Sequence, residues 1–152
     1  MYLADTNILL RFLLLNDPAY QAIRQAVRTL KGRGKQIVTT PQNMAEFWNV
    51  CTRPSTVRGG LGLTVEATEM RLRLLERHFP VLPDNPAIYE KWKALVLAHN
   101  VRGVNVHDAR LVAAMMIHGV THMFTANVKD FQRYSDIHVV EPKPNQMNYR
   151  AT

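Results

Sequence analysis

The sequence contains a single cysteine, Cys51, and no long apolar run. One cysteine excludes an internal disulfide and a thiolate metal cluster. A membrane-spanning helix needs about 18 or more consecutive apolar residues, and the chain has no such run. Residues 1–5, MYLAD, also lack the basic leader and apolar stretch of a signal peptide. We therefore predict a cytoplasmic protein without a membrane anchor.

Metal-binding histidine patterns are missing as well. The six histidines are scattered, and neither HxH nor HExxH occurs. His107 is conspicuous beside Asp108, but we assign it a loop or packing role. The chain shows no repeat, low-complexity segment or interdomain linker. We predict one domain over residues 1–142 and a polar C-terminal tail over residues 143–152.

The composition is that of a folded globular domain with an excess of positive charge. Of its 152 residues, 47% are apolar and 20% are charged, and the formal net charge is +7. This charge favours an anionic partner. It does not distinguish RNA, DNA and an acidic protein, and a soluble protein that is merely basic is the ordinary alternative.

Short apolar runs alternate with helical patterns along the chain. We predict five strands, at residues 2–4, 37–39, 81–82, 123–124 and 138–140. Helix starts are predicted at Asp17-Pro18, Thr40-Pro41, Thr64 and Asn85-Pro86, where a capping residue precedes the helical pattern. This alternation predicts an α/β fold with a parallel sheet flanked by helices on both faces. Such folds bind ligands at the carboxyl ends of their strands.

Polar residues follow two of these strands, and an acid opens a further helix. Asp5 ends the first strand, and Thr125, Asn127 and Asp130 follow the fourth. Asp108 lies at the start of an apolar helix that begins in the segment NVHDARLVAA, residues 105–114. Glu46 lies off the apolar stripe of the helix that follows Thr40-Pro41. Each acid also has an ordinary explanation: Asp5, Asp108 and Asp130 are possible helix caps, and Glu46 a solvated residue.

Gathering these acids at one edge of the sheet has an electrostatic consequence. Two like charges about 4 Å apart repel by roughly 4 kcal/mol at an effective dielectric near 20. A cation relieves this repulsion, and oxygen ligands favour Mg²⁺ or Mn²⁺ over zinc. Such a metal can hold a phosphodiester oxygen and acidify a bound water. We therefore expect Asp5→Asn and Asp108→Asn to fold normally without metal, unless either residue is chiefly a helix cap.

Four motifs in this order resemble the PIN-domain family, and within it the VapC-type toxins of bacterial toxin–antitoxin pairs. They are DTN at residues 5–7, Glu46, HDARLVAA at residues 107–114 and TANVKDF at residues 125–131. The resemblance covers nearly the whole chain. It implies a three-layer fold with a five-stranded parallel sheet and a Mg²⁺- or Mn²⁺-dependent endoribonuclease. It also implies a homodimer and a cognate antitoxin that inserts a segment over the acidic pocket.

The resemblance also assigns roles to individual residues. Asp5, Glu46 and Asp108 match the family's three main acids, Thr6 and Asn7 match its first motif, and Thr125 matches its strand-end hydroxyl. Some members carry an aspartate where this chain has Asn127, so Asn127 and Asp130 share the candidacy for the fourth position. We expect one firmly bound ion, held chiefly by Asp5 and Asp108.

These residues together predict cleavage of RNA phosphodiester bonds by a metal-activated water. The predicted phosphate contacts are basic side chains near the motifs: Arg53, Arg58, Lys129 and Arg133. A phospho-receiver domain also gathers acids around Mg²⁺, but here no acidic pair follows the first strand. A catalytically inactive RNA-binding PIN protein is a second alternative. A flap-type DNA nuclease shares the chemistry but needs a larger chain.

Overall fold

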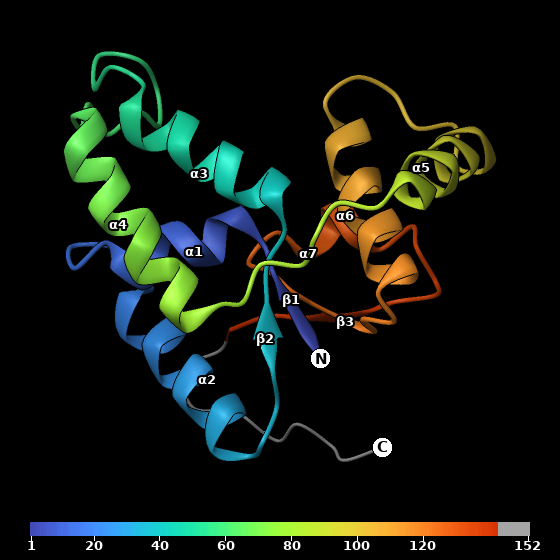
Figure 1. Ribbon diagram of the computed structural model, residues 1–152, viewed down its shortest axis with the longest axis horizontal. Coiled ribbons are helices and arrows are strands. Elements are labelled where there is room, and N and C mark those ends of the chain that lie inside the picture. The colour runs from blue at the N-terminus through green and yellow to red at the C-terminus, as the bar shows by residue number, and fades with distance from the viewer. Residues whose placement is uncertain (143–152) are drawn as a thin grey trace.

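The computed structural model describes residues 1–142, and the predicted tail at residues 143–152 lies outside this range. Helices and strands alternate along the chain (Figure 1). In chain order they are β1 (Tyr2–Ala4), α1 (Thr6–Leu13), α2 (Tyr20–Gly32), β2 (Ile37–Val38), α3 (Pro41–Thr52), α4 (Val65–His78), α5 (Pro86–Ala98), α6 (Asn105–Ile117), β3 (His122–Phe124), α7 (Val128–Phe131) and β4 (His138–Val140). None of the helices in this range is both long enough and apolar enough to cross a membrane.

The strands form one parallel sheet in the order β2-β1-β3-β4. The predicted α/β fold with a parallel sheet is therefore confirmed. From β1 the chain passes to β2 on one side of it, and later returns to β3 on the other side. The carboxyl end of β1 is thus the point at which the strand order reverses, where open α/β sheets bind their ligands. Asp5 follows β1 directly.

The sheet has four strands in the described residues, where five were predicted. The missing strand is the one expected at residues 81–82. Val81 forms only an isolated parallel bridge with Thr39. Pro80 and Pro83 flank this segment, and proline has no N–H to donate to a strand ladder. The pairing consequently stops after a single bridge at the edge of the sheet.

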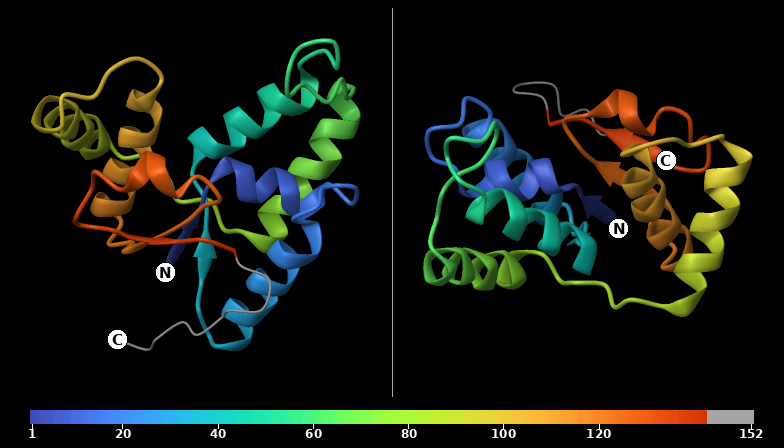
Figure 2. Two further views of the ribbon diagram at one scale, coloured as in Figure 1. Left: turned by 180° about the vertical axis from the view of Figure 1, so that it is seen from behind. Right: turned by 90° about the horizontal axis from the view of Figure 1, so that it is seen from above.

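Alternation of side chains along the strands creates two hydrophobic layers. Tyr2 and Ala4 of β1 pack into a core with α1 to α4, whereas Leu3 packs into a second core with α5 to α7. Figure 2 shows the two groups of helices on opposite sides of the sheet. Because side chains alternate across a strand, each strand contributes to both cores. The result is the predicted three-layer arrangement.

The predicted helix starts are confirmed for α3, α4 and α5. Thr40, Thr64 and Asn85 are their N-caps, and the side chain of each accepts a hydrogen bond from a backbone N–H of the first turn. The turn before α2 contains Asp17, whose carboxylate accepts from the backbone N–H of Ala19, but the helix begins only at Tyr20. The Thr40 cap fixes the start of α3 shortly after β2.

Replacing Phe124 by alanine should destabilise the fold. Phe124 ends β3 and has no exposed surface, and it precedes Thr125 at the sheet edge. Phe→Ala in a core costs about 3–5 kcal/mol of unfolding free energy, because contacts are lost and a cavity remains. Urea denaturation should report this loss. Tyr89→Ala, at a side chain that is 58% exposed, is the control and should change stability little. Equal effects of the two variants would contradict the assignment of Phe124 to the core.

Candidate active site

Asp5 occupies the junction between β1 and α1. Its backbone is extended and its side chain accepts a hydrogen bond from the Thr6 N–H, so Asp5 is the N-cap of α1. The other carboxylate oxygen accepts from Asn7 Nδ2 at 2.6 Å and from Thr125 Oγ1 at 2.6 Å. Asp5 is 8% exposed. The capping role considered from the sequence is confirmed, and it coexists with contacts that reach across the sheet.

Asn7 and Thr125 tie the first strand to the third at this edge. Asn7 Nδ2 also donates to Thr125 Oγ1 at 3.0 Å, and Asn7 Oδ1 accepts from the backbone N–H of Ala126 at 3.0 Å. Thr125 is fully buried, and its hydroxyl further accepts from the backbone N–H of Asn127. Asp5, Asn7 and Thr125 therefore form one hydrogen-bonded unit, although Asp5 and Thr125 are 120 positions apart in the chain.

Glu46 reaches the same edge from α3. Its Oε2 accepts from Thr6 Oγ1 at 2.6 Å, and its Oε1 accepts from Gln42 Nε2 at 2.9 Å. Thr6 Oγ1 accepts in turn from Asn43 Nδ2 at 3.1 Å, and Asn43 is fully buried. Glu46 is therefore a fixed carboxylate beside Asp5, and its alternative as a freely solvated helix residue is wrong.

Asp108 approaches from the other helical layer. Helix α6 starts at Asn105 with Val104 as its N-cap residue, so the possibility that Asp108 caps the helix is wrong. Asp108 lies within the first turn and is half-buried. It thus faces the sheet edge without the compensation that a capping role would provide.

The electrostatics show that the acids have converged. Burial is the largest cause that raises the pKa of Asp108, from 3.8 to about 6. The carboxylates of Asp130, Asp5 and Glu46 contribute in that order, and Arg133 opposes them. Burial, and then the charge of Glu46, likewise raise the pKa of Asp5 against its hydrogen bonds. These charge contributions place Asp108 in the same region as Asp5, Glu46 and Asp130.

The donor set suits a hard divalent cation. It consists of carboxylate, amide and hydroxyl oxygens, with no thiol or imidazole among the side chains that meet there. Within residues 1–142 no group of three or more His, Cys, Asp or Glu side chains lies close enough together to hold a metal ion. Mg²⁺ does not need such a group, because it usually keeps several waters and binds one or two carboxylates. Asp5 and Asp108 are the candidates to hold it.

The remaining predicted residues divide into two groups. Asn127 and Asp130 are exposed at α7, and Lys129 lies between them. Of the residues at and after α7, Asp130 and Arg133 lie near enough to Asp108 to affect its pKa. Their exact roles stay predictions.

Two of the predicted phosphate contacts lie elsewhere. Arg53 is the C-cap residue of α3, and Arg58 lies in the loop between α3 and α4, at the end of α3 opposite to Gln42 and Asn43 (Figure 1). The structure therefore does not bring Arg58 to the four acids. A phosphate contact from Arg58 would have to involve a distant part of a long substrate.

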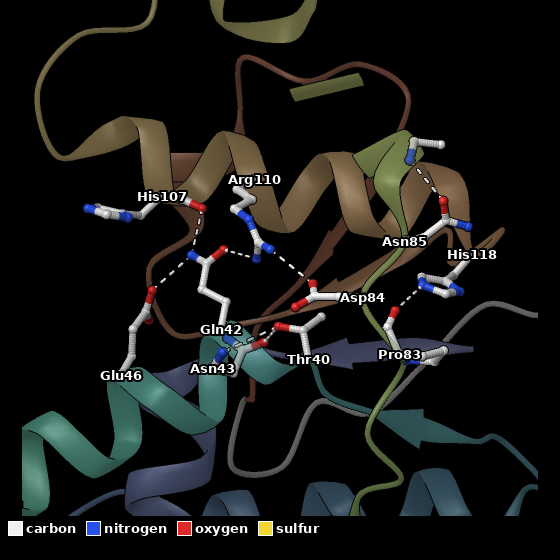
Figure 3. A network of polar contacts seen from close by, with 11 residues as sticks. Thr40, Gln42, Asn43, Glu46, Pro83, Asp84, Asn85, His107, Arg110 and His118 are labelled. Atoms are coloured by element: carbon white, nitrogen blue, oxygen red, sulfur yellow. Dashed lines mark hydrogen bonds and ion pairs between the residues drawn. The ribbon is translucent and has the colours of Figure 1, made fainter. Parts of the chain in front are cut away.

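Sequence reasoning missed the groups that hold Glu46 in place. Gln42 and Asn43 in the first turn of α3 were assigned no role, and Arg110 was seen only as part of a motif. Figure 3 shows Gln42 between Glu46 and Arg110. The spacing of four between Gln42 and Glu46, one helical turn, was a usable signal for their contact. The contact with Arg110 had no local signal.

Comparisons with known proteins identify the family and the fold. A family model for the PIN domain matches residues 2–137. The chain therefore belongs to the PIN-domain family, and the predicted family is confirmed. A search of curated protein sequences found no match.

Solved structures share the fold at low sequence identity. VapBC2 of Rickettsia felis bound to a promoter DNA fragment is 14% identical, with a TM-score of 0.69 and coverage of 92% of this chain and 97% of that one. A toxin–antitoxin complex of Klebsiella pneumoniae is 22% identical, with a TM-score of 0.63 and coverage of 94% and 98%. The sarcin–ricin-loop-cleaving toxin VapC20 of Mycobacterium tuberculosis is 16% identical, with a TM-score of 0.59 and coverage of 81% and 87%. The fold is thus shared with VapC-type proteins over nearly their full length.

Asp108→Asn should stabilise the metal-free protein at neutral pH. The folded state raises the pKa of Asp108 from 3.8 to about 6, so it favours the protonated acid. The wild-type protein therefore loses stability relative to the variant as the pH rises through this window, and the difference is full above the higher pKa. Melting temperatures measured in EDTA should be higher for the variant at pH 7.5, and the gap should close below pH ~4. A variant that is less stable at pH 7.5 would contradict this expectation.

Asp5→Asn should behave differently, which revises the expectation that both variants fold normally. An asparagine at this position keeps an acceptor for the Thr6 N–H but directs an NH₂ group at the Asn7 NH₂ and the Thr125 hydroxyl. Leaving buried donors without acceptors costs about 1–3 kcal/mol. Urea denaturation in EDTA should show this loss at neutral pH. A wild-type midpoint would show that the three-donor arrangement contributes nothing.

Proposed function

We propose that this chain is a metal-dependent endoribonuclease. The observation that supports this most is the meeting of Asp5, Glu46, Asp108 and Asp130 at the carboxyl edge of the sheet. They come from both helical layers and from the end of β1. Burial is the largest cause that raises the pKa of Asp108 to about 6, and the charges of the other three acids add to it. A fold that concentrates negative charge in this way at its ligand-binding edge is suited to hold a cation.

Asp5 and Asp108 would hold Mg²⁺ or Mn²⁺, and Asn127 or Asp130 would contact it directly or through water. Such an ion, when bound, supplies positive charge to a phosphodiester oxygen and lowers the pKa of a bound water. Asp5 is prepared for this role by its hydrogen bonds to Asn7 and Thr125, which keep its carboxylate in one orientation. The hydrogen bonds are outer supports of the type that commonly tunes metal ligands.

Glu46 would orient the attacking water. Both of its oxygens accept hydrogen bonds, from Thr6 and from Gln42, so the carboxylate presents its remaining lone pairs in a fixed direction. A water held in line with the scissile bond would give a 5′-phosphate and a 3′-hydroxyl, without using the RNA 2′-hydroxyl as a nucleophile.

Basic residues near α7 would contact the RNA backbone. Lys129 and Arg133 flank the acids, and the net charge of the chain is +7. An open hollow of about 570 Å³ adjoins them, lined by residues 126–130, Gln132 and Glu141. These features support a nucleic-acid substrate over a small phosphodonor. Arg53 and Arg58 are candidates only for a longer RNA that extends along α3.

The biological role that fits best is the toxin of a toxin–antitoxin pair. The structural neighbours include a toxin–antitoxin complex and a toxin that cleaves the sarcin–ricin loop. We propose an antitoxin protein as the partner of this chain, a homodimer as its assembled form and the cytoplasm as its location. The antitoxin would insert a segment over the acidic pocket, where a cationic side chain would relieve the same repulsion as the metal.

Purified protein should cleave structured RNA in the presence of Mg²⁺ or Mn²⁺. Loss of an outer support of a metal site costs about 10- to 100-fold in activity, so removal of a direct ligand by Asp108→Asn should cost about 100-fold or more. EDTA should abolish cleavage of the wild-type protein. Product ends are identified by their susceptibility to a 5′-phosphate-dependent exonuclease.

The controls separate the alternatives. Because Asp108→Asn is expected to be stable, loss of its activity cannot be attributed to unfolding. Cleavage that persists in EDTA and in Asp108→Asn would disprove the mechanism. RNA binding without any cleavage would support the inactive RNA-binding protein, and a stable mass increase with acetyl phosphate would support the phospho-receiver.

A further inference from the structure

The candidate site is assembled from two helical layers that pack separately. Glu46 belongs to α3, whose apolar residues lie in the core with α1, α2 and α4. Asp108 belongs to α6, whose apolar residues lie in the core with α5 and α7. Neither core by itself determines how Glu46 is placed relative to Asp108. A direct contact between α3 and α6 at this edge would fix that placement more closely.

Gln42 makes that connection. Its Nε2 donates to Glu46 Oε1 at 2.9 Å and to the backbone oxygen of His107 at 2.9 Å. His107 immediately precedes Asp108. One amide group therefore contacts the carboxylate of Glu46 and the backbone next to Asp108 at the same time, as Figure 3 shows from the first turn of α3.

Arg110 contacts the opposite end of the Gln42 amide from Glu46 and His107, and favours the same orientation as they do. Its guanidinium donates to Gln42 Oε1 at 3.2 Å. If the amide were reversed, its NH₂ would face the guanidinium donors and its oxygen would face the carboxylate of Glu46, and both contacts would be repulsive. Arg110 is held in turn by Asp84 at 2.9 Å. Along the contacts Asp84–Arg110–Gln42–Glu46, every donor faces an acceptor only when the Gln42 amide has the orientation seen in the structure.

The Asp84–Arg110 pair adds little stability by itself. The two side chains are 58% and 37% exposed, and exposed ion pairs contribute about 0–1 kcal/mol. Its effect is on the position of the Arg110 side chain. It keeps the guanidinium where Gln42 Oε1 can accept from it, on the side of Gln42 away from Glu46.

We propose that Gln42 is a positioning residue for Glu46, oriented by Arg110 and Asp84. It sets the separation of Glu46 from Asp108 by joining α3 to α6. This inference rests on the proposed nuclease function, because its consequence is on the rate of cleavage. Thr6 holds the other oxygen of Glu46 from α1, so the loss of Gln42 frees one side of the carboxylate but does not release it entirely.

Steady-state cleavage of RNA with Mn²⁺ tests the proposal. Gln42→Ala should lower kcat about 10- to 100-fold, the usual range for an outer support, with KM close to wild type. Arg110→Ala should give a similar loss. The double variant should be no slower than Gln42→Ala, since Arg110 acts through Gln42. Losses that multiply in the double variant would overturn the proposal.

Two further variants distinguish positioning from folding. Gln42→Glu keeps the shape of the side chain and its acceptor for Arg110 but removes the donors to Glu46 and His107, so its kcat should fall as far as that of Gln42→Ala. Arg73→Ala removes a comparable exposed ion pair, to Glu69 at 2.6 Å on α4, and should leave kcat unchanged. Wild-type kcat in Gln42→Glu, or an equal loss in Arg73→Ala, would overturn the proposal.

A second measurement does not depend on cleavage. Without added metal, the two side-chain NH₂ protons of Gln42 should resonate away from the positions of a free glutamine amide, because both are hydrogen-bonded. Arg110→Ala should move them toward the free positions, and Arg73→Ala should not. If wild-type protein cleaves no RNA but the resonances respond in this way, the proposed function fails and the positioning stands. Unchanged resonances in Arg110→Ala would overturn the positioning, whatever the activity.

Discussion

The carboxylate of Asp5 accepts hydrogen bonds from three residues at the sheet edge, and the other groups of the candidate site lie around it. Its contacts to the N–H of Thr6 start α1, and its contacts to Asn7 and Thr125 connect β1 with β3. The strand order reverses at β1, so the hydrogen bonds of Asp5 lie at the carboxyl end of the strand where open α/β sheets bind ligands. Glu46 and Asp108 can therefore approach it from opposite sides.

Gathering acids at one sheet edge lowers the stability of the fold but suits the proposed function. Neutral donors offset the repulsion for two of the acids at this edge: the hydroxyl of Thr6 donates to Glu46 and that of Thr125 to Asp5. Asp108 has the weakest support and the pKa raised to about 6. A bound cation would lower the electrostatic energy of such carboxylates, because each is attracted to the cation while the carboxylates repel one another.

The helix starts that are marked by a capping residue were predicted correctly from the sequence. Thr40 and Asn85 each precede a proline and cap their helices as expected, because capping depends on a hydrogen bond to the next turn. The apolar pair at residues 81–82 predicted a strand. The flanking prolines limit the pairing there to a single bridge. Asp108 was expected at the mouth of α6 but lies inside its first turn, since residues 105–107 already have helical conformation.

The sequence by itself determined the class of fold, the family and the acids that meet, because apolar period, caps and motifs act over a few neighbouring residues. Only the tertiary structure decided how those acids are held. Arg110 contacts Gln42 across 68 positions and Thr6 contacts Glu46 across 40, and no local pattern specifies such pairs. The distances within these pairs depend on how the two helical layers pack against the sheet. Because a hydrogen bond weakens when its length changes by a fraction of an ångström, only the packed structure decides which of them form.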